Sequence, residues 1–132
     1  MDDELEKIKQ KKLKEMQDIM NRPPLPDTPI ELTDQNINTA INEYSQLVVD
    51  CWAVWCGPCT MVGPTIDALA KEKAQKVVFG KLDIDHNHQT AMKYSISAVP
   101  TILIFKDGQL AGRVLGALPK SQLDMKITEF LR

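Results

Sequence analysis

Residues 54–60 read VWCGPCT, a stretch in which a Gly-Pro pair separates Cys56 from Cys59. The spacing C-x-x-C is shared by zinc ribbons and by redox dithiols. A disulfide across two intervening residues closes a very small loop and restricts the unfolded chain little, so stapling of the fold is the weakest interpretation. Metal binding and electron transfer are the two functions that the spacing leaves open.

The sequence around the pair favours electron transfer. Residues 47–52 (LVVDCW) are typical of a buried central strand, and residues 59–73 of a helix with Pro58 suited to its first turn. Cys56 is therefore expected at a helix N-terminus, where unpaired amides and the helix dipole favour a thiolate. This position predicts Cys56 as the nucleophile. Cys59, one turn further on, is predicted to attack the resulting mixed disulfide and to release the partner reduced.

A structural zinc site would need two more good ligands, because such sites usually have four protein ligands. The chain offers Cys51, His86 and His88, and it has no second C-x-x-C. Cys51 lies on the predicted central strand, so it should point away from the helix start and act as a small buried apolar residue. The two histidines fall between a strand and a helix, as solvated loop residues. We therefore predict no metal.

The rest of the chain alternates between short apolar runs and helical patterns. Two of the runs are joined by a turn signal at residues 106–108 (KDG), which predicts a hairpin. The predicted strands cover residues 30–32, 47–52, 77–84, 101–105 and 110–115, and the predicted helices cover 36–44, 59–73, 87–94 and 120–131. This order, βαβαβα followed by ββα, predicts an α/β fold in which helices flank a central mixed β-sheet.

Composition and charge exclude several classes of function. With 132 residues the chain suits one domain, and a net charge of −2 lacks the basic excess expected of a nucleic-acid-binding protein. No run of roughly 18 apolar residues occurs, and the first residues, MDDELEKIKQ, are charged where a signal peptide would be apolar. We expect a cytoplasmic protein without stable membrane association and without a nucleic-acid partner.

The N-terminal part differs from the rest. Residues 1–22 predict an amphipathic helical extension, residues 23–29 a Pro-rich linker, and residues 30–132 the globular domain. One narrow apolar stripe runs along the predicted helix, formed by Leu5, Ile8, Leu13, Met16, Ile19 and Met20. The helix can fold back on the domain or fray in solution, dock on a partner or a second copy, or lie on a membrane surface. Acidic residues that offset the lysines disfavour the membrane.

Four separated runs, VVDCWAVWCGPC, KLDID, AVPTILIFKDG and VLGALPKSQL, together resemble the thioredoxin family in order and spacing. The resemblance covers residues 29–132 and does not extend to the first 28. It implies the thioredoxin fold and a protein-disulfide reductase whose dithiol carries the electrons without a bound cofactor. The implied partners are disulfide-containing target proteins and a thioredoxin reductase as electron donor. The Gly-Pro pair between the cysteines is typical of members that act as reductants.

The resemblance also assigns a role to Asp50, an acid inside the apolar strand LVVDCW. An edge position facing water is the simpler interpretation of such an acid, because an unpaired buried carboxylate is costly. The resemblance implies instead a buried carboxyl that assists proton transfer at Cys59, for which a raised pKa is suited. Lys81 matches the lysine that neighbours this acid in the family, although a lone lysine is more often a surface residue.

The resemblance implies a partner-binding surface beside the cysteines. Most X-Pro bonds are trans, yet the proline that matches Pro100 is cis in this family and lies against the pair. There it leaves the backbone of Val99 free to pair with an extended substrate segment. The implied surface comprises Trp55, Gly57, Pro58, Ile84, Val99, Pro100, Gly116 and Ala117. Val54 and Thr60 depart from the charged residues that many thioredoxins carry, which changes the local field.

The alternative function is that of an interaction module, in which the thioredoxin fold presents a surface and the N-terminal helix docks on a partner. Loss of both cysteines separates the two, because an adaptor would keep its function and a reductant would lose it.

Overall fold

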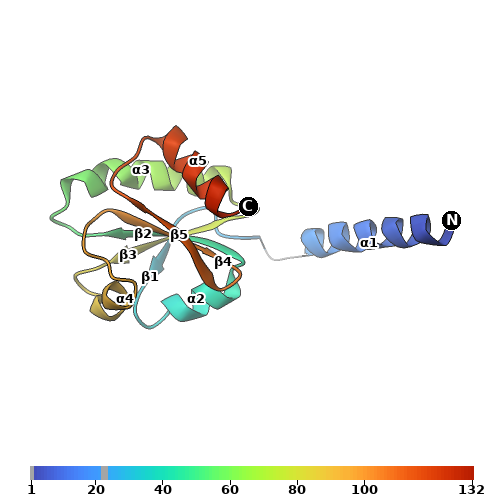
Figure 1. Ribbon diagram of the computed structural model, residues 1–132, viewed down its shortest axis with the longest axis horizontal. Helices are drawn as coiled ribbons and strands as arrows, with labels where there is room; N and C mark the ends of the chain where they lie inside the picture. The colour runs from blue at the N-terminus through green and yellow to red at the C-terminus, as the bar shows by residue number, and fades with distance from the viewer. Residues whose placement is uncertain (1, 22–23) are drawn as a thin grey trace.

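The computed structural model describes residues 2–21 and 24–132, and its core is a five-stranded sheet between two layers of helices (Figure 1). The elements in chain order are α1 (Asp2–Asn21), β1 (Ile30–Leu32), α2 (Ile37–Glu43), β2 (Gln46–Trp52), α3 (Gly57–Glu72), β3 (Val78–Asp83), α4 (His88–Lys93), β4 (Thr101–Lys106), β5 (Gln109–Leu115) and α5 (Lys120–Phe130). The predicted fold class and the predicted order of strands and helices are confirmed, with boundaries that differ by one or two residues.

The strand order β1-β3-β2-β4-β5 places β2 at the centre of the sheet. β2 pairs in parallel with β3 and antiparallel with β4. β4 and β5 form the predicted hairpin, and both residues of its tight turn, Asp107 and Gly108, have positive φ angles of 51° and 82°. Because β1, β2 and β3 run in one direction, their carboxyl ends meet at one edge of the sheet, and α3 begins there.

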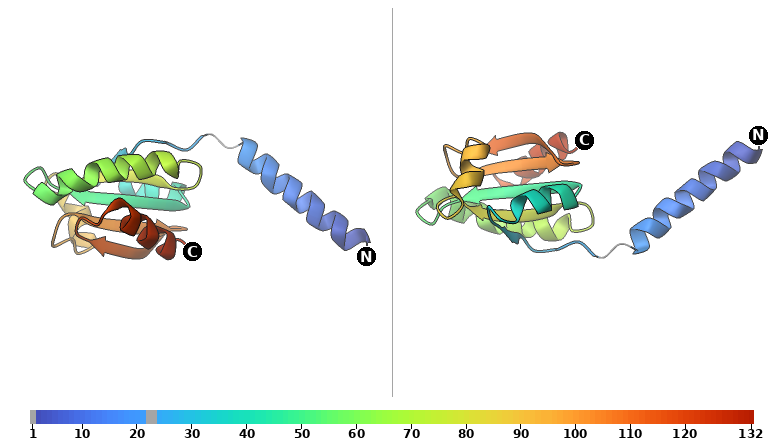
Figure 2. Two further views of the ribbon diagram at one scale, coloured as in Figure 1. Left: turned by 90° about the horizontal axis from the view of Figure 1, so that it is seen from above. Right: turned by 90° about the horizontal axis from the view of Figure 1, so that it is seen from below.

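Helices α3 and α5 cover one face of the sheet, and α2 and α4 cover the other, as the two views of Figure 2 show. β2 divides its side chains between the two faces in the usual alternation. Val48 lies in the core cluster with α3 and α5, whereas Leu47, Val49 and Cys51 lie in the opposite cluster with α2. Leu123 and Ile127, on the inner face of α5, are fully buried.

The N-terminal helix is present as predicted, and Figure 1 shows it apart from the sheet and the other helices. Its described apolar side chains are exposed: Leu5, Ile8, Leu13, Met16 and Met20. After it, Leu25 packs against the core cluster on the α2 face. Met1, Arg22 and Pro23, and with them the predicted boundary between extension and linker, lie outside the described residues. None of the helices in the described part of the chain is long and apolar enough to cross a membrane.

Candidate active site

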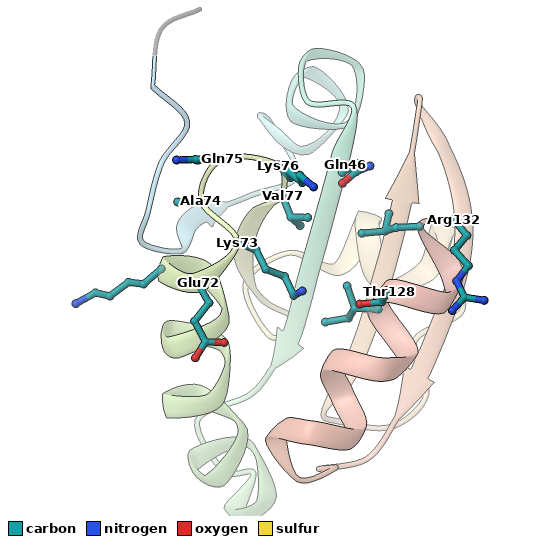
Figure 3. A pocket seen from close by; sticks show the side chains of 12 residues that line it. Gln46, Glu72, Lys73, Ala74, Gln75, Lys76, Val77, Thr128 and Arg132 are labelled. Atoms are coloured by element: carbon teal, nitrogen blue, oxygen red, sulfur yellow. The ribbon is translucent and has the colours of Figure 1, made fainter. Parts of the chain in front are cut away.

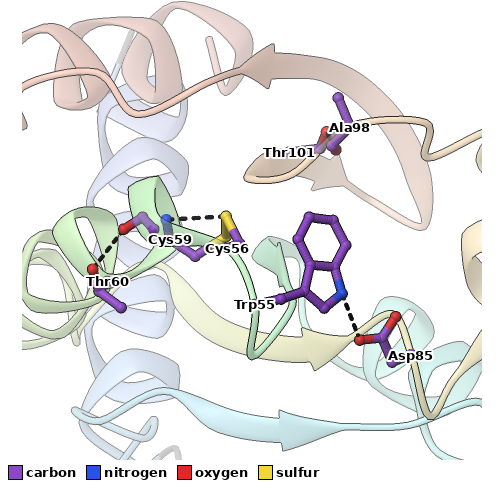
Figure 4. Close-up of a disulfide and its surroundings, with 8 residues drawn as sticks. Trp55, Cys56, Cys59, Thr60, Asp85, Ala98 and Thr101 are labelled. Atoms are coloured by element: carbon purple, nitrogen blue, oxygen red, sulfur yellow. Dashed lines mark hydrogen bonds between the residues drawn. A yellow bond between two sulfur atoms is a disulfide. The ribbon is translucent and has the colours of Figure 1, made fainter.

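Cys56 and Cys59 form a disulfide at the start of α3, with their Cα atoms 5.3 Å apart (Figure 4). Cys56 is the N-cap residue of this helix, and its Sγ accepts a hydrogen bond of 3.2 Å from the backbone amide of Cys59. Pro58 occupies the first turn, where no intrahelical amide is needed. The predicted position of the pair, directly after the central strand and at a helix N-terminus, is confirmed.

Both cysteines are largely buried, with exposed fractions of 4% for Cys56 and 6% for Cys59. Together with Ala53 they form a small apolar cluster, on which Trp52, Ile84 and Val99 pack. Burial therefore does not tell the nucleophile from the resolving thiol. The difference lies in the hydrogen bond, because among the described residues the Cys56 sulfur, and not that of Cys59, accepts a bond from a backbone amide at the end of the helix. Such a bond stabilises a thiolate.

Trp55 stands at the rim of this cluster with 69% of its surface exposed. Its Nε1 donates a hydrogen bond of 2.9 Å to Oδ2 of Asp85, which follows β3 (Figure 4). Sequence reasoning did not single out Asp85, although the acid ends the run KLDID that carries part of the resemblance. Gly57 and Pro58 are exposed beside Trp55, as is Val54.

The Val99–Pro100 peptide bond is cis, as the resemblance implied. Val99 contacts the cysteine cluster, and the Pro100 carbonyl accepts a hydrogen bond of 2.9 Å from the amide of Gly116. Gly116 is exposed and has a φ of 88°, a conformation that favours glycine. Ala117 is half-buried and packs against the core cluster of α3 and α5. The structure thus joins the cysteine cluster, the cis-proline loop and the Gly116 turn.

Asp50 lies on the central strand and is 2% exposed, which excludes an edge position facing water. Its Oδ1 has no hydrogen-bond partner among the described residues. The pKa of the Asp50 carboxyl is raised to about 6, chiefly by burial. The Lys81 ammonium lowers this pKa, and the Asp67 carboxylate raises it. A carboxyl with this pKa can both accept and release a proton near neutral pH.

Lys81 is the register partner of Asp50 on β3, as the resemblance implied for these two residues. Its ammonium, however, forms an ion pair of 3.1 Å with Oδ1 of Asp67 on α3. Sequence reasoning missed Asp67, because a carboxylate on the outer side of a helix resembles an ordinary surface charge.

The remaining candidates for metal binding lie apart. Cys51 is a buried free cysteine on the opposite face of the sheet, and burial raises the pKa of its thiol to about 12. His86 is exposed, and its hydrogen bond to Asp83, 2.8 Å from Nδ1 to Oδ2, raises its pKa. His88 is exposed at the start of α4. Across residues 2–21 and 24–132, no three metal-ligating side chains come together.

A groove of about 640 Å³ lies at the other end of the sheet, where β2 and β3 begin (Figure 3). Val77, Ile127 and Leu131 supply its apolar lining, and charged side chains such as Lys73 and Arg132 surround it. It holds neither cysteine and none of the predicted site residues. The groove is therefore separate from the redox chemistry.

Comparison with known proteins agrees with this geometry. Residues 28–129 match the family model described as Thioredoxin. Thioredoxin 2 of Chlorobaculum tepidum is 43% identical over 102 residues, which cover 76% of this chain and 94% of that protein. The thioredoxin of Alicyclobacillus acidocaldarius is 38% identical over 101 residues, which cover 76% of this chain and 96% of that protein.

The fold is also that of solved thioredoxins. The structure of a mutant thioredoxin from Halobacterium salinarum superposes with a TM-score of 0.77 at 27% identity, over 84% of this chain and 97% of that one. Family model, relatives and fold thus cover the same part of the molecule, which includes the Cys56–Cys59 pair. The chain belongs to the thioredoxin family and is a thiol–disulfide oxidoreductase with protein-disulfide reductase activity.

Proposed function

We propose that Cys56 is the attacking thiol, Cys59 the resolving thiol, and Asp50 the group that exchanges a proton with Cys59. The observation that carries this division of roles is the hydrogen bond of 3.2 Å from the Cys59 amide to the Cys56 sulfur at the N-cap of α3. It stabilises negative charge on Cys56 and leaves Cys59 as the thiol that needs a base. Disulfide-containing proteins are the substrates, and a reductase restores the dithiol.

The reaction proceeds in two exchanges. The Cys56 thiolate attacks one sulfur of the target disulfide, so that a mixed disulfide forms and the other target sulfur leaves as a thiolate. Cys59 then loses its proton and attacks the Cys56 sulfur, which forms the Cys56–Cys59 disulfide and releases the second target thiolate. Two electrons have passed from the dithiol to the target. The two target thiolates take up two protons from solvent, which balance the two protons that Cys56 and Cys59 have released to it.

Asp50 suits the proton transfer in the second exchange. Its carboxyl is buried, its pKa is raised to about 6, and one of its oxygens is free of protein partners among the described residues. An acid with these properties accepts the Cys59 proton at neutral pH and passes it on to solvent. We propose Lys81 as the neighbouring cation that limits how far this pKa rises.

The partner surface that we propose surrounds the disulfide. The exposed residues Trp55, Gly57 and Pro58 form one side, and Ile84, Val99, Pro100, Gly116 and Ala117 form the other. An extended segment of the target would pair with the backbone of Val99 next to the cis peptide bond. We propose the cytoplasm as the compartment, since a reducing environment keeps a reductant's dithiol and the buried Cys51 as thiols.

The midpoint potential of the Cys56–Cys59 couple tests the direction of electron flow. We expect the family value for thioredoxins, about −270 mV, which is known for the family and does not follow from this geometry. Equilibration in graded dithiothreitol buffers, followed by tryptophan fluorescence and thiol alkylation, measures it. A value near −180 mV, which is typical of disulfide isomerases, would contradict the role of a reductant.

The Cys59→Ser variant tests the division of roles between the two thiols. Without a resolving thiol, the first exchange stops at the mixed disulfide, so target proteins should accumulate on Cys56. Mass spectrometry of the trapped complexes identifies the cysteine that is bound. The Cys56→Ser variant is the matched control and should trap far fewer targets. Equal trapping by both variants would contradict the assignment.

A second candidate function is that of an interaction module, favoured by the exposed apolar side chains of α1. We propose that α1 docks on a partner protein or on a second copy of the chain. The double variant Cys56→Ser, Cys59→Ser would retain a docking function and lose a reductive one. Sedimentation of the full chain, compared with a chain that lacks α1, measures self-association. A species with the mass of a single chain at all concentrations, for the full chain as for the shortened one, would contradict docking on a second copy.

A further inference from the structure

Three charged side chains from three elements meet on the α3 face of the sheet. Asp50 of β2 and Lys81 of β3 are register partners. Val48 and Phe79, two residues before them on the same strands, belong to the core cluster of α3 and α5, so Asp50 and Lys81 also face α3. The third member, Asp67, lies on α3. One ammonium is therefore placed between two carboxyl groups.

Lys81 pairs with only one of these two carboxyl groups. Its Nζ lies 3.1 Å from Oδ1 of Asp67, and no ion pair joins it to Asp50. A buried charge beside an opposite charge gains most from direct pairing, so an unopposed Lys81 would be drawn to Asp50. Instead, Oδ1 of Asp50 lacks a partner in the described part of the chain. The ammonium thus lies next to the helix carboxylate, while the buried carboxyl stays without an ion pair among the described residues.

Gly63 leaves room for this arrangement. It lies one helical turn before Asp67 on α3, and a Cβ built on it would come within 3.9 Å of the Lys81 Nζ. The Lys81 ammonium thus lies next to the backbone of Gly63, where no side chain occupies the space, and contacts Asp67. A methyl group fits there in ordinary van der Waals contact, whereas a longer side chain would compete for the same space.

We propose that Asp67 is a positioning residue of the redox site, which holds the Lys81 ammonium next to Gly63 and so prevents it from pairing with Asp50. This inference deepens the proposed function and rests on the role of Asp50 given there. The charges of Lys81 and Asp67 shift the pKa of the Asp50 carboxyl. The register partner of Asp50 on β4, Ile102, is uncharged. On the far face of the sheet, the charge of Arg113 lowers the pKa of the Cys51 thiol.

The Asp67→Asn variant of the full chain tests the proposal. Release of Lys81 should stabilise the Asp50 carboxylate and move the midpoint of its titration to lower pH, by about 0.5 or more. Carbon-13 NMR of the disulfide form follows this titration, and the signal is assigned by its loss in Asp50→Asn. Asp67 is more than half exposed, so the substitution should leave the fold intact. Asp67→Glu, which preserves the ion pair, should keep the midpoint near that of the native chain.

The Lys81→Gln background separates an effect through the lysine from a direct effect of the Asp67 charge. If Asp67 acts by positioning Lys81, its replacement by Asn should shift the Asp50 midpoint less than half as far once Lys81 is gone. An unchanged midpoint in Asp67→Asn, or an equal shift in both backgrounds, would overturn the inference. The proposed function is decided separately by the pH profile of disulfide reduction. If Asp50→Asn leaves that profile unchanged, the proton role of Asp50 fails, whatever the NMR titration shows.

Discussion

Asp50 is a carboxyl group in the interior of a sheet, and its effect on stability depends on pH. Its pKa is raised by burial from 3.8 to about 6, so the folded state binds more protons than the unfolded state between these values. Stability therefore falls as the pH rises from about 4 through about 6, and the full penalty is present above that range. A rise of this size corresponds to about 3 kcal/mol as an upper bound.

We therefore predict that Asp50→Asn stabilises the disulfide form at pH 7.5, by up to about 3 kcal/mol more than at pH 3.5. Urea unfolding at a series of pH values, with the disulfide intact, measures the difference. Asp107→Asn is the matched control, because Asp107 is exposed in the hairpin turn and asparagine also accommodates its positive φ. A gain from Asp50→Asn that is the same at all pH values would contradict the assigned penalty.

The packing of α5 on the sheet depends on one small residue of β5. A Cβ built on Gly112 would overlap the ring of Phe130, which packs against the core cluster of α3 and α5. Gly112→Ala should therefore push the end of α5 from the sheet and lower the free energy of unfolding by about 1–3 kcal/mol. Chemical unfolding followed by circular dichroism measures the loss.

Gly57→Ala is the control for this prediction. A Cβ built on Gly57, at the start of α3, has no heavy atom within 4 Å. Its replacement should change the free energy of unfolding by no more than about 0.5 kcal/mol. If Gly112→Ala proved as stable as the native chain, the contact between β5 and Phe130 would not hold α5 in place.

At the scale of the whole molecule, the described part of the extension, α1, lies apart from the sheet and the other helices (Figure 1). We propose the division into residues 1–22, 23–29 and 30–132, and predict that a chain starting at Pro24 keeps the stability of the full chain within about 0.5 kcal/mol. The apolar side chains of α1 are exposed, so its removal uncovers little of the domain. Thermal and urea unfolding of the two chains make the comparison.

A chain that starts at Thr28 provides the contrast, because it also lacks Leu25. Leu25 is partly buried against the α2-side core cluster, and its loss should cost about 1–2 kcal/mol. If the chain starting at Pro24 were already destabilised by that much, the α1 stripe would have to pack on the domain in solution. That result would contradict the division proposed here.

The sequence by itself determined the elements of the fold and the chemistry of the site. The apolar runs and helical spacings predicted each strand and helix, because these patterns depend on residues that are close in the chain. The position of Cys56 at a helix start follows from the same local patterns, whereas the burial of Asp50 was implied by the family resemblance. Resemblance to a family supplied the cis bond before Pro100, which composition would have predicted as trans.

Only the tertiary structure decided which distant side chains meet. The ion pair of Lys81 with Asp67, the hydrogen bond of Trp55 to Asp85 and the packing of Leu25 on the core all join residues from different segments. No periodicity in the sequence encodes them, because each depends on the strand order and on how α3 and the linker cross the sheet. For this reason the reactive cysteines could be predicted from the chain, whereas Asp67, the carboxylate that pairs with Lys81 beside Asp50, became visible only in three dimensions.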